Sequence, residues 1–506
     1  MPDRTPAQHA HALPHANPDA SSFLLRGGMV VDGSGAPPYR ADVLVRGDRI
    51  AAIGAFEAPL DAQVIDATGF VITPGFIDSH THDDGYLLAH PDMTPKVSQG
   101  ITTVVTGNCG ISLAPLSPRV IPQPLDLLGP PALFRFDTFA GWLAALRATP
   151  AATNVIPLVG HTTLRVECMA DLERAANENE TARMRELFED AMQAGAFGMS
   201  TGTFYPPAAQ ATIEEIIAVG APLREHGGVF ATHLRDEADL IVDAMEEALT
   251  IGRALDALVV FSHHKLAGEK NHGRSQETLN LIEQAATRQP VCLDCHPYPA
   301  TSTMLRIDRV RISRRTMITW SKGYPAATGR DFSDVMAELG LDDEAALKRL
   351  TPAGAIYFLM DERDVERIIT HPLAMVGSDG LPFDPHPHPR QWGTFTQVLR
   401  KLVRETQVLT LEGAIHKMTG LAARNYGIAE RGLLQAGHFA DLVLLDPARV
   451  ADNATFEAPI QVSTGIEQVW VNGQPVWDGK AGKSGLLPGR VLQRARPTSS
   501  DGHIRH

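Results

Sequence analysis

Eight short apolar runs, separated mostly by helical patterns, constrain the fold of this 506-residue chain more than any other feature. The runs are FVITPGFIDSHTH, TTVVTGNCG, NVIPLVGHT, GAFGMST, GVFATHL, LVVFSHHK, PVCLDCHPY and AMVGSDG. Helical patterns such as ETARMRELFEDAMQA lie between most of them. Strands and helices that alternate at a spacing of about 30–50 residues are typical of a (β/α)8 barrel, or TIM barrel.

An open, doubly wound sheet would show the same alternation, so the positions of the polar residues are used to distinguish the two folds. Polar residues follow most of the predicted strands at their C-terminal ends, at His80, His82, Cys109, His161, His233, His263, His296 and Asp379. In a barrel these ends meet on one face, which is where barrel enzymes build their active sites. We therefore predict an α/β fold with a (β/α)8 barrel.

Two β-rich segments flank the predicted barrel. Residues 21–73 and 428–495 contain strand-like runs separated by turn sequences such as DGSG, RGDR and VNGQ. We predict that they form a small β-sandwich domain from both chain ends, around a barrel at residues 74–427. Within the barrel, residues 299–370 are too long for a βα loop, and we predict an inserted lid there.

Composition limits the partners and the compartment. The formal net charge of −14 argues against nucleic acid and anionic membranes as partners. There is no run of 18 apolar residues and no secretory signal pattern, and four cysteines are too few for a disulfide scaffold, so we predict a cytoplasmic protein. Residues 1–20 are predicted to be a disordered tail without a metal site at His9 and His11, and residues 496–506 a second tail.

Four histidines and one cysteine indicate a metal site. Strand side chains repeat every two residues, so the rings of His80 and His82 point the same way. His233 and His263 end neighbouring predicted strands and can face one centre. Cys109 in TGNCG is either a thiolate metal ligand or a nucleophile, and the nearby histidines favour the metal ligand.

The remaining candidate residues have two interpretations each. Cys292 and Cys295 form a C-x-x-C motif, but an offset of three on a strand sends their side chains to opposite faces, so we predict packing roles. Asp379 is either a turn residue or the group that orients a reacting water and moves its proton. Lys265 and Arg390 are either surface cations or ligands of a substrate carboxylate.

These residues predict a metal-dependent hydrolase, because zinc generates hydroxide near neutral pH and polarises a carbonyl group. Eight motifs in order resemble the N-acyl-D-amino-acid deacylases, or D-aminoacylases, of the amidohydrolase superfamily. The motifs are SHTHDD, GITTVVTGNCG, GHTTLR, FGMSTGTFYPP, THLRDE, SHHK, VGSDG and HPR, and the resemblance covers nearly the whole chain.

The resemblance implies a TIM barrel with a small β-sandwich and a tight zinc held by Cys109, His233 and His263. It also implies a second, weaker metal position at His80 and His82. Many relatives bridge two metals with a carboxylated lysine, but the fourth predicted strand, GAFGMSTGTF, contains no lysine. Cys109 fits the bridging role used in this branch.

The implied reaction is hydrolysis of the amide bond of N-acyl-D-amino acids, giving a carboxylate and a free D-amino acid. Asp379 would take a proton from the attacking water and return it to the leaving amine. Residues that match the family's grip on the substrate carboxylate are Tyr205, Lys265 and Arg390, with Ser302 assisting.

The side-chain preference rests on two positions in IYFLMDE. Tyr357 and Met360 match residues that line the side-chain pocket of relatives acting on apolar D-amino acids, so the resemblance implies apolar substrates. Two alternatives stay open: another amidohydrolase acting on cyclic amides or amide-linked xenobiotics, and a non-catalytic scaffold of the same fold. The sequence does not indicate whether the protein is a monomer or an oligomer.

Overall fold

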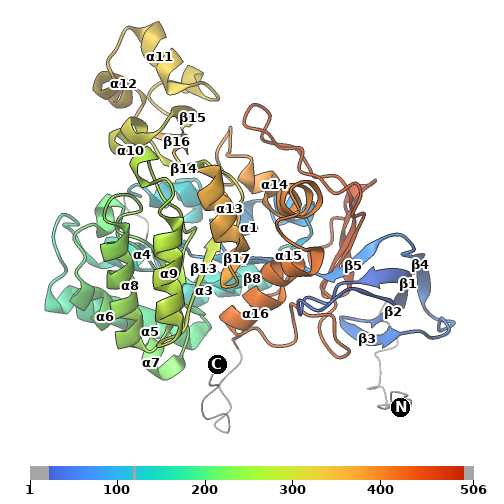
Figure 1. Cartoon of the computed structure of the whole chain (residues 1–506). Coiled ribbons are helices and arrows are strands. Elements are labelled where there is room, and N and C mark those ends of the chain that lie inside the picture. Colours follow the sequence, from blue (N-terminus) through green and yellow to red (C-terminus); the bar gives the residue numbers. More distant parts are fainter. Residues whose placement is uncertain (1–21, 118–120, 495–506) are drawn as a thin grey trace.

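The chain folds as an α/β protein with a central barrel, a β-rich domain and a projecting insertion (Figure 1). The computed structural model describes residues 22–117 and 121–494. The two predicted tails, and with them His9 and His11, lie outside the described residues. Within the described residues, no helix is both long enough and apolar enough to cross a membrane.

Eight parallel strand positions close into the predicted barrel. A backbone hydrogen bond of 3.3 Å from Ser79 to Val376 joins the last strand to the first. In spatial order the strands are β6 (Phe76–Asp78), β7 (Ile101–Thr106), β8 (Asn154–Pro157) continued by β9 (Val159–Gly160), β10 (Gly198–Gly202), β11 (Val229–His233), β12 (Leu258–Phe261), β13 (Val291–Cys295) and β17 (Ala374–Val376). All eight apolar runs of the sequence supply one of these strand positions, so the prediction of the barrel is confirmed.

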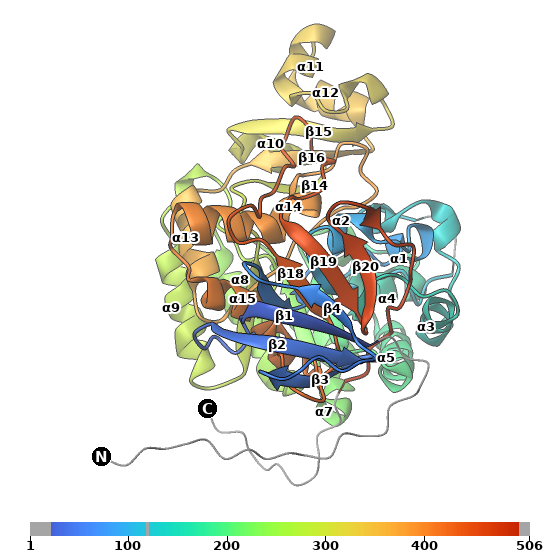
Figure 2. The same cartoon turned by 90° about the vertical axis from the view of Figure 1, so that its right-hand side faces the viewer.

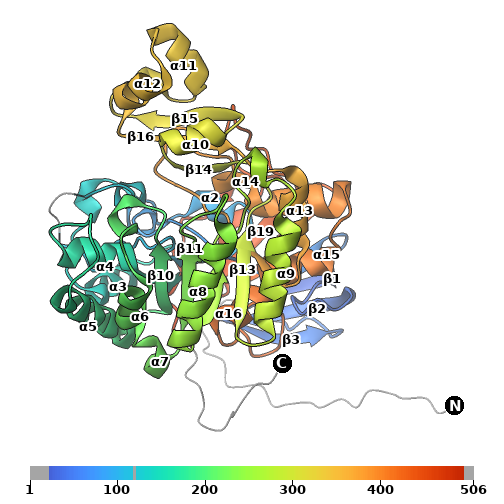
Figure 3. The ribbon, with the colours of Figure 1, turned by 60° about the vertical axis from the view of Figure 1, so that its left-hand side comes forward.

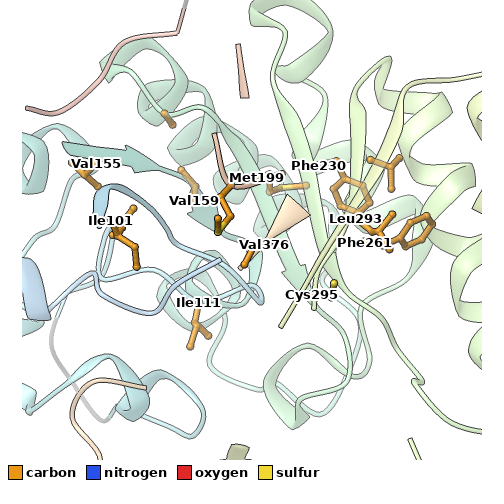
Figure 4. Close-up of a cluster of buried hydrophobic side chains, with 14 of the residues drawn as sticks. Ile101, Ile111, Val155, Val159, Met199, Phe230, Phe261, Leu293, Cys295 and Val376 are labelled. Atoms are coloured by element: carbon orange, nitrogen blue, oxygen red, sulfur yellow. The ribbon is translucent and has the colours of Figure 1, made fainter. Parts of the chain in front are cut away.

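Side chains along the barrel strands alternate between two apolar clusters. One cluster takes one or two residues from most of the strands, Cys292 and Val260 among them, and therefore fills the barrel interior. The other contains Cys295 and Phe261, which Figure 4 shows, and also includes residues of the surrounding helices. Cys292 and Cys295 thus pack on opposite sides of β13, as their offset of three residues predicts, and both are free thiols.

Amphipathic helices cover the outside of the barrel. In Figure 3, α8 and α9 lie side by side against the strands. The longest, α5, begins with a capping box in which Asn177 and Glu180 satisfy each other's backbone N–H groups. The helices are α3 (Phe139–Ala148), α4 (His161–Cys168), α5 (Glu178–Ala194), α6 (Ile213–Gly220), α8 (Ile241–Leu255), α9 (Ser275–Ala286), α13 (Glu362–Thr370), α14 (Arg390–Gln397) and α15 (Leu411–Met418). A further helix, α16 (Gly420–Tyr426), packs against the apolar cluster of the barrel interior.

Both ends of the described chain build one nine-stranded sheet beside the barrel (Figure 2). Its two halves meet where β5 pairs antiparallel with β18, with Thr73 opposite Val443. The strands are β1 (Ser22–Val30), β2 (Tyr39–Arg46), β3 (Arg49–Gly54), β4 (Gln63–Asp66), β5 (Val71–Pro74), β18 (Leu442–Leu445), β19 (Ile466–Val471), β20 (Gln474–Asp478) and β21 (Gly482–Lys483). A small β domain made from both ends is therefore present, as predicted.

The segment between β13 and β17 forms a compact unit that projects from the barrel (Figures 1 and 2). Its three antiparallel strands and three helices enclose their own apolar core. The elements are β14 (Thr301–Met304), α10 (Ile307–Ile312), β15 (Arg315–Ser321), α11 (Phe332–Leu339), α12 (Asp343–Leu350) and β16 (Ala353–Phe358). This unit places β14 and β16 beside the C-terminal ends of the barrel strands.

Candidate metal centre and active site

The C-terminal ends of four barrel strands bring the five predicted metal ligands close together. His80 and His82 follow β6, Cys109 follows β7, His233 ends β11 and His263 follows β12. Ligand atoms within 4.8 Å of one another form two groups that share the cysteine: Cys109 with His233 and His263, and Cys109 with His80, His82 and Asp379. The predicted ligands therefore lie together at one end of the barrel.

Cys109 lies between the two groups. Its Sγ is 3.2 Å from Nε2 of His80 and 3.1 Å from Nε2 of His263. The His233 and His263 ring centroids are 4.4 Å apart with their planes at 80°. A thiolate in this position can contribute to either group, which is the arrangement needed if two metals share one ligand.

The donor atoms fit a zinc ion. Both ring nitrogens of His233 and Nδ1 of His82 are buried without a hydrogen-bond partner, which is costly unless another species satisfies them. Burial lowers the pKa of His80 to about 3 and keeps it neutral, the form that binds metal. Burial also raises the pKa of the Cys109 thiol well above its usual value, so a thiolate here needs a cation beside it.

Unusual backbone geometry positions three of the site residues. Cys109, His263 and Asp379 have φ values of 53°, 37° and 51°, a region that residues other than glycine seldom adopt. Such strain persists where the surrounding structure enforces it, and it is common at functional sites. Gly202 at the end of β10 permits the Cys109 turn, because a Cβ there would collide with the carbonyl oxygen of Cys109.

Asp379 is held between the histidines and a guanidinium group. Its Oδ1 is 3.3 Å from Nε2 of His82, and its Oδ2 is 2.8 Å from Nη1 of Arg390. Burial alone would raise the pKa of this carboxyl group, but Arg390 and His263 hold it well below its usual range. The carboxylate is therefore ionised and able to accept a proton.

Two carboxylates behind the histidines were missed by the sequence analysis. Asp294 on β13 lies 3.1 Å from Nδ1 of His80 and accepts a 2.7 Å hydrogen bond from the backbone N–H of His263. Glu237 lies 3.2 Å from Nδ1 of His263. Carboxylates in this position orient ligating imidazoles and fix their tautomers. Two sequence features could have identified these carboxylates: Glu237 comes four residues after His233 in THLRDE, and Asp294 lies inside the C-x-x-C motif.

A small enclosed cavity of about 20 Å³ adjoins the predicted metal ligands; we call it the reaction cavity. Four of the predicted substrate-binding residues line it, namely Tyr205, Lys265, Ser302 and Tyr357. The Tyr205 hydroxyl lies 3.0 Å from Oγ1 of Thr303, and Nζ of Lys265 contacts Glu237 and lies 2.6 Å from Nδ1 of His263. Tyr357 uses its hydroxyl to donate to the carbonyl of Met304 at 2.8 Å.

Two predicted substrate-binding residues lie outside the lining of the reaction cavity. Arg390 is fully buried and contacts Asp379, His296 and the backbone of β14. Met360 packs in the apolar core of the projecting unit. Two of the polar residues at strand ends also lie outside the lining of the reaction cavity. His161 contacts Glu215 at 3.2 Å, and His296 accepts a 3.1 Å hydrogen bond from Arg390.

The sequence analysis also missed Phe204 and Arg309, which line the reaction cavity. Phe204 stacks on the ring of His233 with centroids 5.2 Å apart and planes at 16°. Arg309 on α10 is almost fully buried, with its guanidinium carbon 4.3 Å from the Phe204 ring centroid. A buried guanidinium group in the cavity wall is well suited to bind a carboxylate.

Comparison with known proteins gives a consistent result. The amidohydrolase family model matches residues 63–477. An N-acyl-D-aspartate deacylase from Alcaligenes xylosoxydans xylosoxydans is 70% identical over 94% of this chain and 95% of its own. A solved D-aminoacylase with a binuclear metal centre is 55% identical, with a TM-score of 0.91 over 93% of this chain and 99% of its own.

A second solved structure that is similar to this chain contains zinc and an inhibitor. It is an N-acyl-D-glutamate deacylase from Bordetella bronchiseptica, complexed with zinc and a phosphonate inhibitor that mimics the tetrahedral intermediate. It is 45% identical to this chain, with a TM-score of 0.89 over 93% of this chain and 99% of its own.

Proposed function

This chain belongs to the amidohydrolase family and, within it, to the N-acyl-D-amino-acid deacylases, and from this we propose that it hydrolyses N-acyl-D-amino acids. The products are a carboxylate and a free D-amino acid. The observation that carries the proposal is the position of an ionised Asp379 within 3.3 Å of His82, beside the Cys109 and histidine cluster. Zinc is the metal that suits this cysteine and histidine donor set.

Cys109, His233 and His263 would hold the tighter zinc, and His80 and His82 a second, weaker one. A bound zinc would supply Lewis-acid polarisation of the amide carbonyl and lower the pKa of water. Asp294 and Glu237 hold the imidazole rings of His80 and His263 in place for this role.

Asp379 is the proton carrier of the proposed reaction. Its ionised carboxylate takes a proton from the attacking water as the water adds to the carbonyl carbon. The same carboxyl group then returns the proton to the leaving nitrogen, so that the amine departs neutral. Arg390 holds Asp379 in position through the 2.8 Å contact of Nη1 with Oδ2.

The substrate's α-carboxylate meets cations and hydroxyl groups in the reaction cavity. Lys265 and Tyr205 line the cavity, with Nζ of Lys265 2.6 Å from Nδ1 of His263, and Ser302 lines it from β14. An ammonium group and hydroxyl donors give a carboxylate charge-assisted hydrogen bonds. This grip fixes the substrate and so limits which stereoisomer presents its amide to the metal ligands.

We propose that the preferred side chain is acidic, in contrast to the apolar preference that the sequence favours. Met360 lies outside the cavity lining, and the hydroxyl of Tyr357 is occupied by the carbonyl of Met304. Arg309 instead places a buried guanidinium group in the cavity wall. The relative at 70% identity, an N-acyl-D-aspartate deacylase, supports the same choice.

The test compares N-acetyl-D-aspartate, N-acetyl-D-methionine and N-acetyl-L-aspartate as substrates of the purified, zinc-loaded enzyme. We expect turnover of both D-compounds, the highest kcat/KM with N-acetyl-D-aspartate, and no measurable turnover of the L-compound. Turnover of N-acetyl-D-methionine above the aspartate derivative would reject the acidic preference. Turnover of no N-acyl-D-amino acid would reject the reaction itself.

A further inference from the structure

We propose that Lys96 is a positioning residue that fixes Asp379 relative to the end of β6, the strand that directly precedes His80. The inference rests on the proposed function, because Asp379 is the proposed proton carrier, and it gives a role to a side chain that does not line the reaction cavity. Lys96 lies on α2 (Thr94–Val97), a short helix that packs against α14 (Figure 3).

The ammonium group of Lys96 is fully buried among oxygen atoms. It donates hydrogen bonds to Oδ2 of Asp78 and to Oγ of Ser378, both at 2.9 Å, and forms an ion pair with Asp83 at 3.2 Å. Burial alone would lower the pKa of Lys96, but the two aspartates raise it above its usual value. The group therefore stays charged, and its hydrogen bonds are of the strong, charge-assisted kind.

Two of these partners lie next to residues of the candidate site. Asp78 ends β6, two residues before His80, and its Oδ1 accepts a 3.4 Å hydrogen bond from the N–H of His80. Ser378 directly precedes Asp379, and its own N–H donates to Oδ1 of Asp78 at 2.7 Å. One ammonium group thus joins two segments that lie 300 residues apart in the chain.

Residues 378–380, which we call the Asp379 turn, are held by hydrogen bonds at each position. Beyond the bond of Ser378 to β6, the N–H of Asp379 donates to the carbonyl of His80 at 2.8 Å. The N–H of Gly380 donates to Oγ of Ser378 at 3.3 Å, the same oxygen that Lys96 binds. The φ of 51° at Asp379 persists only where the surroundings enforce it, and these bonds supply that constraint.

The position of the Asp379 turn decides where the carboxylate of Asp379 lies relative to the predicted metal ligands. The carboxylate is 3.3 Å from Nε2 of His82, and a displacement of about 1 Å in a reacting group can cost about 100-fold in rate. Neither Lys96 nor Ser378 lines the reaction cavity, so their loss should leave substrate binding largely intact. The expected signature is a fall in kcat at nearly constant KM.

The first pair of variants removes one hydroxyl group each. Ser378→Ala removes the oxygen that Lys96 and Gly380 share. Ser79→Ala is the matched control, because Ser79 is also fully buried and its hydroxyl donates to the carbonyl of Val376 at 2.9 Å. The control therefore loses a bond between the same two barrel strands, β6 and β17, without touching the Lys96 contacts.

The second pair removes one buried ammonium group each. Lys96→Met is the test variant. Lys417→Met is the matched control, because Lys417 is also buried and its Nζ contacts the backbone carbonyls of His371 and Ala374, at the start of β17. The free energy of unfolding of all four variants is measured alongside their kinetics, so that an effect on stability is separated from an effect on rate.

With the preferred N-acetyl-D-amino acid, Ser378→Ala should lower kcat by about 5- to 20-fold and Lys96→Met by about 20- to 100-fold. KM should stay within about 3-fold of wild type in both. The two controls should keep kcat within about 3-fold. The double variant Lys96→Met/Ser378→Ala should lose less than the product of the two single losses, because both changes break the same contact.

Zinc titration gives a readout that does not depend on turnover. Lys96→Met should bind the second zinc, at His80 and His82, about 10- to 100-fold more weakly, which is the usual cost of losing a group that orients a ligand. The tighter zinc should be retained, and Lys417→Met should bind both as wild type does.

The outcomes separate this inference from the proposed function. Losses in kcat that match those of the controls, losses that multiply in the double variant, or a rise in KM with kcat preserved would each overturn the role of Lys96. Absence of turnover of any N-acyl-D-amino acid by the wild type would overturn the proposed function, and the second zinc would then decide the role of Lys96, with unchanged affinity overturning it. If Lys96→Met does not fold, the comparison of Ser378→Ala with Ser79→Ala decides.

Discussion

Nη1 of Arg390 lies 2.8 Å from Oδ2 of Asp379, and both side chains are buried at the C-terminal end of the barrel. Arg390 also donates to His296 and to the carbonyl of Ser302, so the guanidinium group is fixed on several sides. Arg390 therefore fixes the position of Asp379, the proposed proton carrier, whereas the family resemblance implies that Arg390 binds the substrate carboxylate directly. The first prediction separates these two roles.

Arg390→Lys should lower kcat by about 10- to 100-fold while KM changes by less than about 3-fold. The lysine keeps the charge but cannot reproduce the fixed geometry of the guanidinium group, and small displacements of a reacting group cost up to about 100-fold. Steady-state kinetics with N-acetyl-D-aspartate measure the effect. A large rise in KM with kcat preserved would show that Arg390 binds the substrate instead.

Asp379→Asn should abolish most turnover and retain zinc. Removal of a general acid–base group typically costs about 10²- to 10⁴-fold in kcat. Asp256→Asn is the matched control, because Asp256 also has a positive φ, of 50°, but lies exposed at the end of α8. Kinetics and metal analysis on both variants decide the question, and near-normal kcat in Asp379→Asn would exclude it as the proton carrier.

Cys109→Ala should lose the tight zinc. Loss of a partner that merely orients a ligand costs about 10- to 100-fold in metal affinity, so loss of a ligand should cost at least about 100-fold. Cys292→Ala removes another buried thiol, from the barrel interior, and should keep its zinc. Metal content after dialysis against a weak chelator provides the measurement. Full zinc occupancy in Cys109→Ala would contradict the ligand assignment.

Arg309→Gln should reduce the preference for acidic substrates. A hydrogen bond to a charged group contributes about 1.5–3 kcal/mol, so kcat/KM for N-acetyl-D-aspartate should fall by about 10- to 150-fold. The rate with N-acetyl-D-methionine serves as the internal control and should stay within about 3-fold of wild type. An equal fall for both substrates would indicate that Arg309 supports the fold of the cavity wall.

Glu215 should make the fold sensitive to acid. Burial would raise its pKa, but His161, Arg165 and the N–H of Ala176 bring it to about 2, from 4.5. Between pH 2 and pH 4.5 the unfolded chain binds a proton at Glu215 that the folded chain does not bind. The contribution of Glu215 to the free energy of unfolding is therefore complete above pH 4.5 and is lost as the pH falls toward 2.

Glu215→Gln should therefore lower the free energy of unfolding by about 1.5–3 kcal/mol at pH 7, and its deficit relative to wild type should shrink as the pH falls below 4.5. The exposed neighbour of Glu215 on α6, changed as Glu214→Gln, is the control and should match wild type. Denaturant titrations at several pH values test this. A deficit that is constant with pH would refute it.

The residues at the strand ends of the barrel could be predicted because the apolar runs and the polar residues that follow them indicate the same strand ends. His80, His82, His233 and His263 each follow an apolar run, and parallel strands in a barrel carry their C-terminal residues to one face. Asp294 and Glu237 could not be found in this way. Asp294 lies inside a strand whose apolar cysteines dominate its pattern, and Glu237 lies in a loop where a carboxylate is ordinarily exposed.

The wall of the reaction cavity was harder to predict for a different reason. Arg309 comes from the projecting unit, an insertion with its own apolar core that lies outside the repeating strand–helix pattern of the barrel. Met360 was assigned to the substrate pocket by its place in the sequence, although the chain turns it into that core. The position of a residue along a barrel strand predicts which way its side chain points, whereas the position of a residue in an insertion does not.

The antiparallel pairing of β5 with β18 also means that β5 is synthesised long before the strand that pairs with it. Residues 75–441 must leave the ribosome between these two strands, which takes about 20–70 s at usual elongation rates. Throughout that interval the N-terminal strands present an open edge with unpaired backbone groups, the feature from which aggregation starts. The edge of β5 is covered only when β18 has been made.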